Sequence, residues 1–68
     1  MQIDYSKILL KIRARMNLSQ EALAERLKVS FATINRWENE QYEPTRRHIQ
    51  QILDLCDEVG IRIKETNY

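Results

Sequence analysis

The apolar side chains of residues 5–16 recur every three or four positions, and charged side chains lie between them. This spacing places one apolar stripe along one face of an α-helix. The stripe consists of Tyr5, Ile8, Leu9, Ile12 and Met16. The pattern therefore predicts a helix from Tyr5 to Met16, with Lys11, Arg13 and Arg15 on its solvated face.

Two short helical segments follow, and a serine precedes each of them. Ser19 is a natural N-cap for a helix over residues 20–27, and Ser30 is one for a helix over residues 31–38. Ile34 and Trp37 lie three positions apart on one face of the second segment, as expected of core residues. Two short helices joined by such a brief turn are typical of a helix-turn-helix. Residues 19–39 therefore form the predicted motif.

A fourth helix is predicted after Pro44, with Thr45 as its cap and Gly60 as its end. Its apolar stripe consists of Ile49, Ile52, Leu53, Cys56 and Val59. Residues 61–68 are expected to form a short strand or an extended tail. Two uses of the C-terminal part of the chain stay open. In the first, Leu55 or the Ile61/Ile63 segment supplies a dimer surface. Alternatively, Ile61 and Ile63 fold back over the first helix and complete the core.

Composition favours one small all-α domain over residues 1–68. The chain has one Gly and one Pro, so chain breaks are few and helices are favoured over many short strands. Cys56 has no second cysteine to pair with and lies on an apolar stripe, so we expect an inert core thiol. His48 is expected at the surface. Neither a metal-ligand set nor a catalytic or cofactor motif occurs, which predicts a protein that is not an enzyme.

Net charge and hydropathy restrict the classes of partner that the sequence supports. Eleven Lys and Arg residues against ten Asp and Glu residues give a net charge of +1. Nucleic-acid-binding domains often have a pI above about 9, so bulk charge gives that function no support here. No apolar run approaches the ~20 residues that span a bilayer, and residues 1–4 lack a signal-peptide pattern. We therefore expect a cytoplasmic protein without a membrane partner.

The segment from Leu18 to Asn39 resembles the phage repressor/Cro-type helix-turn-helix family, also known as the xenobiotic-response-element family. The resemblance rests on the spacing of Gln20, Ala24, Val29, Ile34, Trp37, Glu38 and Asn39. It implies a lambda-repressor-like bundle of four or five short helices. It also implies that the helix at about 31–38 enters the major groove of double-stranded DNA. Because the tail lacks the usual fifth-helix pattern, four helices are favoured.

The same resemblance implies a set of contacts. The residues facing base edges would be Phe31, Ala32, Asn35 and Arg36, and those touching phosphates would be Gln20, Ser30, Thr33 and Asn39. The chemistry agrees, because Asn can pair bidentately with adenine and Arg with guanine. Two alternatives remain: Phe31 as an edge-of-core or dimer residue, and Arg36 as a phosphate clamp.

Arg46 and Arg47 stand in the first turn of the fourth helix, where the helix dipole disfavours cations. A phosphate bound at that helix N-terminus would explain them, so both are predicted phosphate contacts. The alternative is pairing with Glu40 or Glu43. One cation of the first helix is a further candidate for the DNA backbone.

Two residues depart from the family pattern, which usually has glycine in the turn and again after the second helix of the motif. Lys28 and Glu40 occupy these positions. If Lys28 is left-handed, as the turn requires, its side chain costs about 1 kcal/mol. The substitution at Glu40 leaves the path of the following loop open.

The leading functional hypothesis is a sequence-specific transcriptional regulator, more readily a repressor, that binds DNA as a homodimer with half-sites about 34 Å apart. The alternative is a protein-interaction module, such as an antitoxin that binds a partner protein and represses its own operon. The near-zero net charge and the apolar tail favour this second reading.

Overall fold

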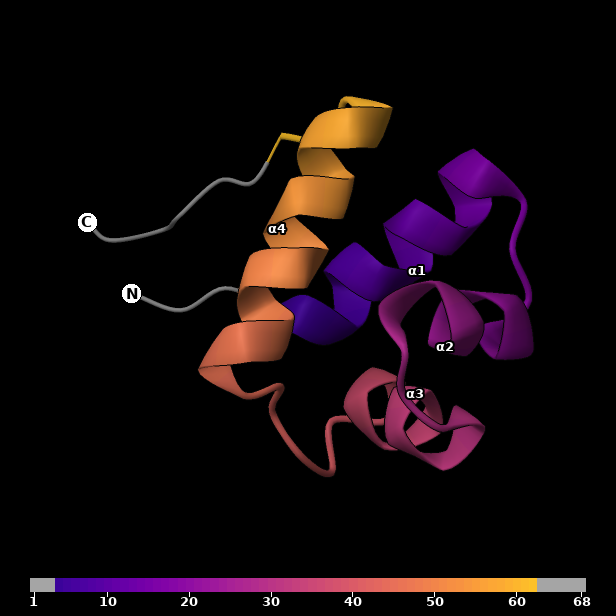
Figure 1. Ribbon diagram of the computed structural model, residues 1–68, viewed down its shortest axis with the longest axis vertical. Coiled ribbons are helices and arrows are strands. Elements are labelled where there is room, and N and C mark those ends of the chain that lie inside the picture. The colour runs from indigo at the N-terminus through magenta and orange to yellow at the C-terminus, as the bar shows by residue number, and fades with distance from the viewer. Residues whose placement is uncertain (1–3, 63–68) are drawn as a thin grey trace.

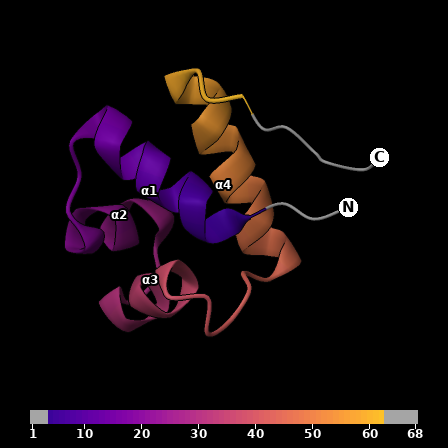
Figure 2. The same cartoon turned by 180° about the vertical axis from the view of Figure 1, so that it is seen from behind.

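A computed structural model describes residues 4–62, and in this part of the chain it contains four α-helices. They are α1 (Tyr5–Met16), α2 (Gln20–Leu27), α3 (Phe31–Glu38) and α4 (Arg46–Val59). Figures 1 and 2 show α4 alongside α1, with α2 and α3 together at one end of this pair. The predicted all-α bundle is confirmed, and the helix bounds agree with the sequence pattern.

Three of the four helices begin with a side-chain cap. The Asp4 carboxylate accepts the N–H of Lys7 and the hydroxyl of Ser6, and the latter bond lowers the pKa of Asp4. Ser19 caps α2 and Ser30 caps α3, each by accepting the N–H three residues on. Such a bond satisfies one of the orphan donors of the first turn.

The start of α4 is different. Thr45 has the extended backbone of an N-cap, but its hydroxyl makes no cap hydrogen bond. Instead it lies 3.0 Å from Nδ1 of His48. Thr45 was predicted to cap this helix, and only its backbone does so.

The turns use left-handed residues where helices end. Asn17, Lys28 and Gly60 are C-caps at φ 56°, 61° and 77°, and Glu40 in the loop after α3 has φ 61°. Lys28 therefore adopts the strained conformation that its place in the turn predicts, as does Glu40. Left-handed backbone costs a residue with a Cβ about 1–2 kcal/mol, and less for asparagine.

The core lies where the four helices meet. Its fully buried side chains are Leu9, Ile12, Leu23, Ile34, Ile52 and Cys56. Trp37 is also buried, as predicted, and its ring packs 5.2 Å from that of His48, which is half-buried rather than at the surface. Burial raises the pKa of the Cys56 thiol, so the group stays protonated at neutral pH, as expected of a core cysteine.

The structure tests part of the two predicted uses of the C-terminal region, through Leu55 and Ile61. Leu55 is 5% exposed and belongs to the core, so its predicted role as a dimer surface is wrong. Ile61 is also buried in the core, and its N–H bonds to the carbonyl of Cys56. The prediction that Ile61 folds back into the core is therefore confirmed. Ile63 and the rest of the predicted tail lie outside the described residues. No helix within residues 4–62 is both long enough and apolar enough to cross a membrane.

Candidate functional site

The eight residues of α3 divide into a buried face and an open face. Ile34 is 0% exposed and Trp37 6% exposed, so these two side chains anchor the helix to the core. Phe31, Ala32 and Arg36 are exposed on the opposite side. The helix therefore offers a surface of small, aromatic and cationic groups without losing its attachment.

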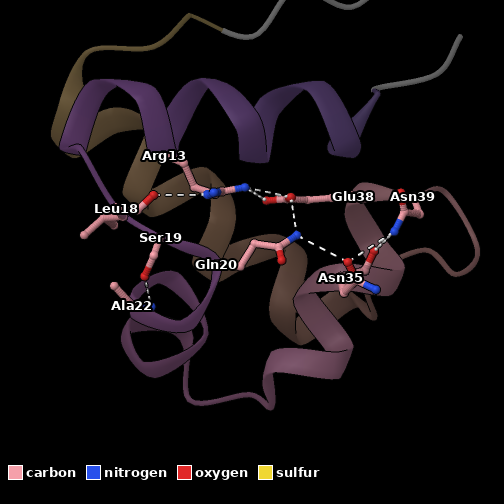
Figure 3. A network of polar contacts seen from close by, with 8 residues as sticks. All are labelled: Arg13, Leu18, Ser19, Gln20, Ala22, Asn35, Glu38 and Asn39. Atoms are coloured by element: carbon pink, nitrogen blue, oxygen red, sulfur yellow. Dashed lines mark hydrogen bonds and ion pairs between the residues drawn. The ribbon is translucent and has the colours of Figure 1, made fainter.

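Arg13 of α1 and Glu38 of α3 form an ion pair that the helices largely cover. Nη1 of Arg13 lies 2.9 Å and 3.2 Å from the two carboxylate oxygens, and the Glu38 side chain is only 6% exposed (Figure 3). Nε of Arg13 also donates to the carbonyl of Leu18. The predicted solvated position of Arg13 is wrong, because α1 packs against α3 and brings the two charges together.

Gln20 extends this ion pair toward the open face of α3. Its Nε2 lies 2.7 Å from Oε1 of Glu38 and 3.4 Å from Oδ1 of Asn35 (Figure 3). Nδ2 of Asn39 donates to the backbone carbonyl of Asn35 at 2.9 Å and to Oδ1 of Asn35 at 3.2 Å. We call this connected set the inner network; its members are Arg13, Gln20, Asn35, Glu38 and Asn39.

Ser30 and Thr33 form a smaller polar pair at the start of α3. The Ser30 hydroxyl accepts the Thr33 N–H and lies 2.9 Å from the Thr33 hydroxyl. Both hydroxyl groups thus lie at the start of the helix, where the first N–H groups before Thr33 have no acceptor within the helix and can bind an anion.

Phe31 is half exposed, and it lines a shallow depression together with Ala22 and Val29. The side chain is therefore partly covered by the protein and partly open to solvent. This position is compatible with a base contact and with the edge-of-core alternative.

Arg36 points over an aromatic ring that the sequence analysis did not single out. Its Cζ lies 5.7 Å from the ring centroid of Tyr42, a side chain that is 64% exposed. A guanidinium within about 6 Å of a ring centroid is attracted to the ring face. The signal in the sequence was an aromatic residue in a polar loop, six positions after an exposed arginine.

Arg46 and Arg47 begin α4 and are exposed. Among the residues described, neither forms an ion pair with Glu40 or Glu43, so the pairing alternative is not realised. We call Arg36, Tyr42, Arg46 and Arg47 the open edge. It lies along the end of α3, the loop that leaves it and the first turn of α4.

The comparisons with known proteins agree with this geometry. A helix-turn-helix family model matches residues 9–63, which is most of the chain. The chain belongs to the Cro/C1-type helix-turn-helix family. The helix-turn-helix domain is thus a DNA-binding domain, and α3 occupies the place of its second motif helix. Searches of curated proteins and of solved structures gave no significant match.

The helix-turn-helix domain joins three of its predicted contact residues, Gln20, Asn35 and Asn39, in one network. It leaves Phe31, Ala32 and Arg36 apart from that network on the exposed face. Sequence reasoning gave Glu38 and Tyr42 no contact role, and it considered Arg13 only as one of the first helix's cations that could reach the DNA backbone. Arg13 and Glu38 are 25 residues apart, so no local pattern relates them.

Proposed function

We propose that this domain binds double-stranded DNA in a sequence-specific way and represses transcription, with α3 in the major groove. The observation that carries the proposal is the division of α3 into an anchored face, Ile34 and Trp37, and an exposed face of groove-compatible side chains. An α-helix fits a groove about 12 Å wide. Asn35 and Arg36 are the proposed readers, with Phe31 and Ala32 making apolar contacts.

The proposed phosphate contacts surround this helix. They are Gln20, Ser30, Thr33, Asn39, Arg46 and Arg47. The amide N–H groups of Gln20 already face Glu38 and Asn35, so a phosphate there meets mainly the backbone N–H groups that begin α2. Arg46 and Arg47 supply charge at the start of α4, where no carboxylate of the described chain neutralises them.

We also propose that a homodimer binds two half-sites about 34 Å apart, as two-fold helix-turn-helix proteins do. Because Leu55 of α4 is buried, the apolar side chain that we propose for the dimer contact is Leu10 of α1, which is 48% exposed. Sedimentation of the domain with and without a selected duplex would measure the stoichiometry.

Fluorescence anisotropy with mixed-sequence duplexes across a salt series tests the proposal. We expect affinity to fall steeply as salt rises, because phosphate contacts release counterions. Arg36→Ala and Arg46→Ala should weaken binding, and each lost phosphate contact should reduce the salt slope by about 1. Arg26→Ala removes the same charge from a cation paired with Glu58 and is the matched control. A DNA affinity that changes neither with salt concentration nor in the variants Arg36→Ala and Arg46→Ala contradicts the proposal.

A second candidate is the protein-interaction module, such as an antitoxin. It is supported by the exposure of two large apolar side chains, Leu10 and Phe31, on α1 and α3. Absence of DNA binding at low salt, with the domain folded by circular dichroism, would favour this function over the first.

A further inference from the structure

The amide group of Asn35 has a defined polarity in the inner network. At one end of this network, Nη1 of Arg13 donates to both carboxylate oxygens of Glu38. An ionised carboxylate only accepts hydrogen bonds. The Gln20 amide must therefore turn its nitrogen, not its oxygen, toward Glu38, as it does at 2.7 Å. The same nitrogen faces Oδ1 of Asn35.

Asn39 fixes the same polarity from the other side. Its Nδ2 donates to the backbone carbonyl of Asn35, which is an acceptor only. That nitrogen also lies 3.2 Å from Oδ1 of Asn35. Two donors therefore converge on Oδ1, and Nδ2 of Asn35 points away from both of them (Figure 3).

Reversing the Asn35 amide would place its nitrogen against two other nitrogens. Gln20 cannot reverse in response, because its oxygen would then face the Glu38 carboxylate. Asn39 cannot reverse either, because its oxygen would face the carbonyl of Asn35. Each member thus opposes the reversal of the next, most strongly at the part-buried contact of Gln20 with Glu38, where water replaces a lost hydrogen bond least easily.

We propose that Asn35 reads DNA as a hydrogen-bond donor only. The bidentate contact with adenine needs Oδ1 to accept from the 6-amino group while Nδ2 donates to N7. Here Oδ1 is occupied and only Nδ2 is free to enter the groove. The inferred target is an acceptor edge, foremost guanine with its N7 and O6, or thymine with its O4. This replaces the adenine pairing that residue type alone suggested.

Gln20 and Asn39 are then positioning residues for this contact. They act through the orientation of Asn35, in addition to any contact of their own with phosphate. The inference rests on the proposed function, since it specifies what one residue of α3 recognises once the helix lies in the major groove.

Selection of bound duplexes from a random pool, with the wild type and with Asn35→Ala, locates the position that Asn35 reads. It is the position at which Asn35→Ala loses its preference while others persist. We expect guanine or thymine there, with an advantage of about tenfold in Kd over adenine for the preferred base. Cytosine at that position, or no position that depends on Asn35, overturns the inference.

If adenine is selected, a base analogue decides. Replacing that adenine with purine removes the 6-amino group and leaves N7 in place. Unchanged affinity supports a donor-only contact through N7, whereas a loss of about tenfold shows the bidentate contact and overturns the inference. Failure of the wild type to bind any duplex instead contradicts the proposed function, so the two failures are distinguishable.

The double variant Gln20→Ala/Asn39→Ala tests the positioning role. Once freed, the Asn35 amide can rotate, so the tenfold ratio between the preferred base and adenine should fall to about one. A merely structural role would weaken all sequences alike and leave the ratio unchanged, which overturns the assignment. Gln50→Ala, which removes an amide bonded to Asp54 on α4, is the matched control. If the double variant does not fold, Asn39→Ala alone should lower the ratio in the same direction, and an unchanged ratio overturns it.

Discussion

On one side of α3, five polar side chains join in the inner network before any ligand is present. At the open edge, by contrast, the arginines form no ion pair with the described residues. Arg36 has only the face of Tyr42 beside it, and Arg46 and Arg47 are exposed. The two regions are neighbours in the fold, and they use their polar groups in opposite ways.

The difference separates two tasks in recognition. A base-contacting side chain whose orientation is fixed in the free protein loses less conformational entropy on binding and can discriminate between bases. Free arginines attract any polyanion and adjust to the phosphates they meet, which gives affinity without sequence information. The net charge of +1 is compatible with DNA binding on these terms, because a phosphate meets the local charge of the open edge, whose arginines form no ion pair with the described residues.

The largest effect is expected from breaking the inner network at its covered ion pair. Arg13→Ala leaves the Glu38 carboxylate nearly buried with only Gln20 as a donor, and should lower the free energy of unfolding by about 3 kcal/mol. Urea denaturation at pH 7 measures this loss. Arg26→Ala removes an ion pair of the same length whose partners are 43% and 60% exposed, and should cost about 0.5 kcal/mol.

Equal losses in these two variants would show that the cover over Glu38 is unimportant. The double variant Arg13→Met/Glu38→Leu provides a further check, because it removes both charges together. We expect it to be more stable than Arg13→Ala, since no unpaired carboxylate remains in the interior.

The N-caps of α2 and α4 extend the comparison, with an expected effect of about 1 kcal/mol on the free energy of unfolding. Ser19→Ala removes a hydroxyl that accepts the N–H of Ala22 and should destabilise the domain by about 1 kcal/mol. Thr45→Ala, at the N-cap of α4 next to the open edge, removes no cap bond and should cost only a few tenths of a kcal/mol. Thermal unfolding of both variants measures the difference, and a larger loss for Thr45→Ala would mean that its contact with His48 matters more than the missing cap.

Much of the fold followed from local signals in the sequence. The helical period of the apolar residues and the serine caps predicted the bounds of α1, α2 and α3, because those signals act within one or two turns. Lys28 at a left-handed position was also predictable, since the short turn of the motif requires it.

The inner network was not predictable in this way. Its ion pair joins α1 to α3, and charge patterns along one helix cannot show which residue of another helix will face them. Leu55 was misplaced for a related reason. It lies beside the main stripe of α4, and only the packing of α1 and α2 against α4 shows that Leu55 is buried while Leu53 of the predicted stripe is only partly buried.

Lys28 and Glu40, the two turn residues with left-handed backbone, test whether backbone strain differs between the turn within the motif and the loop after α3. Lys28→Gly, between α2 and α3, and Glu40→Gly, in the loop that leaves α3, should each stabilise the domain by about 0.7 kcal/mol. This is the relief of left-handed strain, less the entropy that glycine adds to the unfolded chain. Gly60→Ala should destabilise the domain, because φ at this position is 77°, in the left-handed region. A Cβ there meets no atom within 4 Å, so the loss measures backbone strain alone. A gain at only one of the two sites would show that side-chain contacts, not strain, govern the other.

The smallest effect is expected from loosening the open edge itself. Tyr42→Leu removes the ring under Arg36 but leaves the charge, so it should weaken DNA binding about twofold, the amount of an exposed cation–π contact of about 0.5 kcal/mol. The salt slope should not change, because no phosphate contact is lost. Anisotropy titrations of Tyr42→Leu, Tyr42→Phe and the wild type measure both quantities, and Tyr42→Phe should bind like the wild type. If Tyr42→Phe is as weak as Tyr42→Leu, the hydroxyl rather than the ring face makes the contact, and the open edge is more ordered than its exposure indicates.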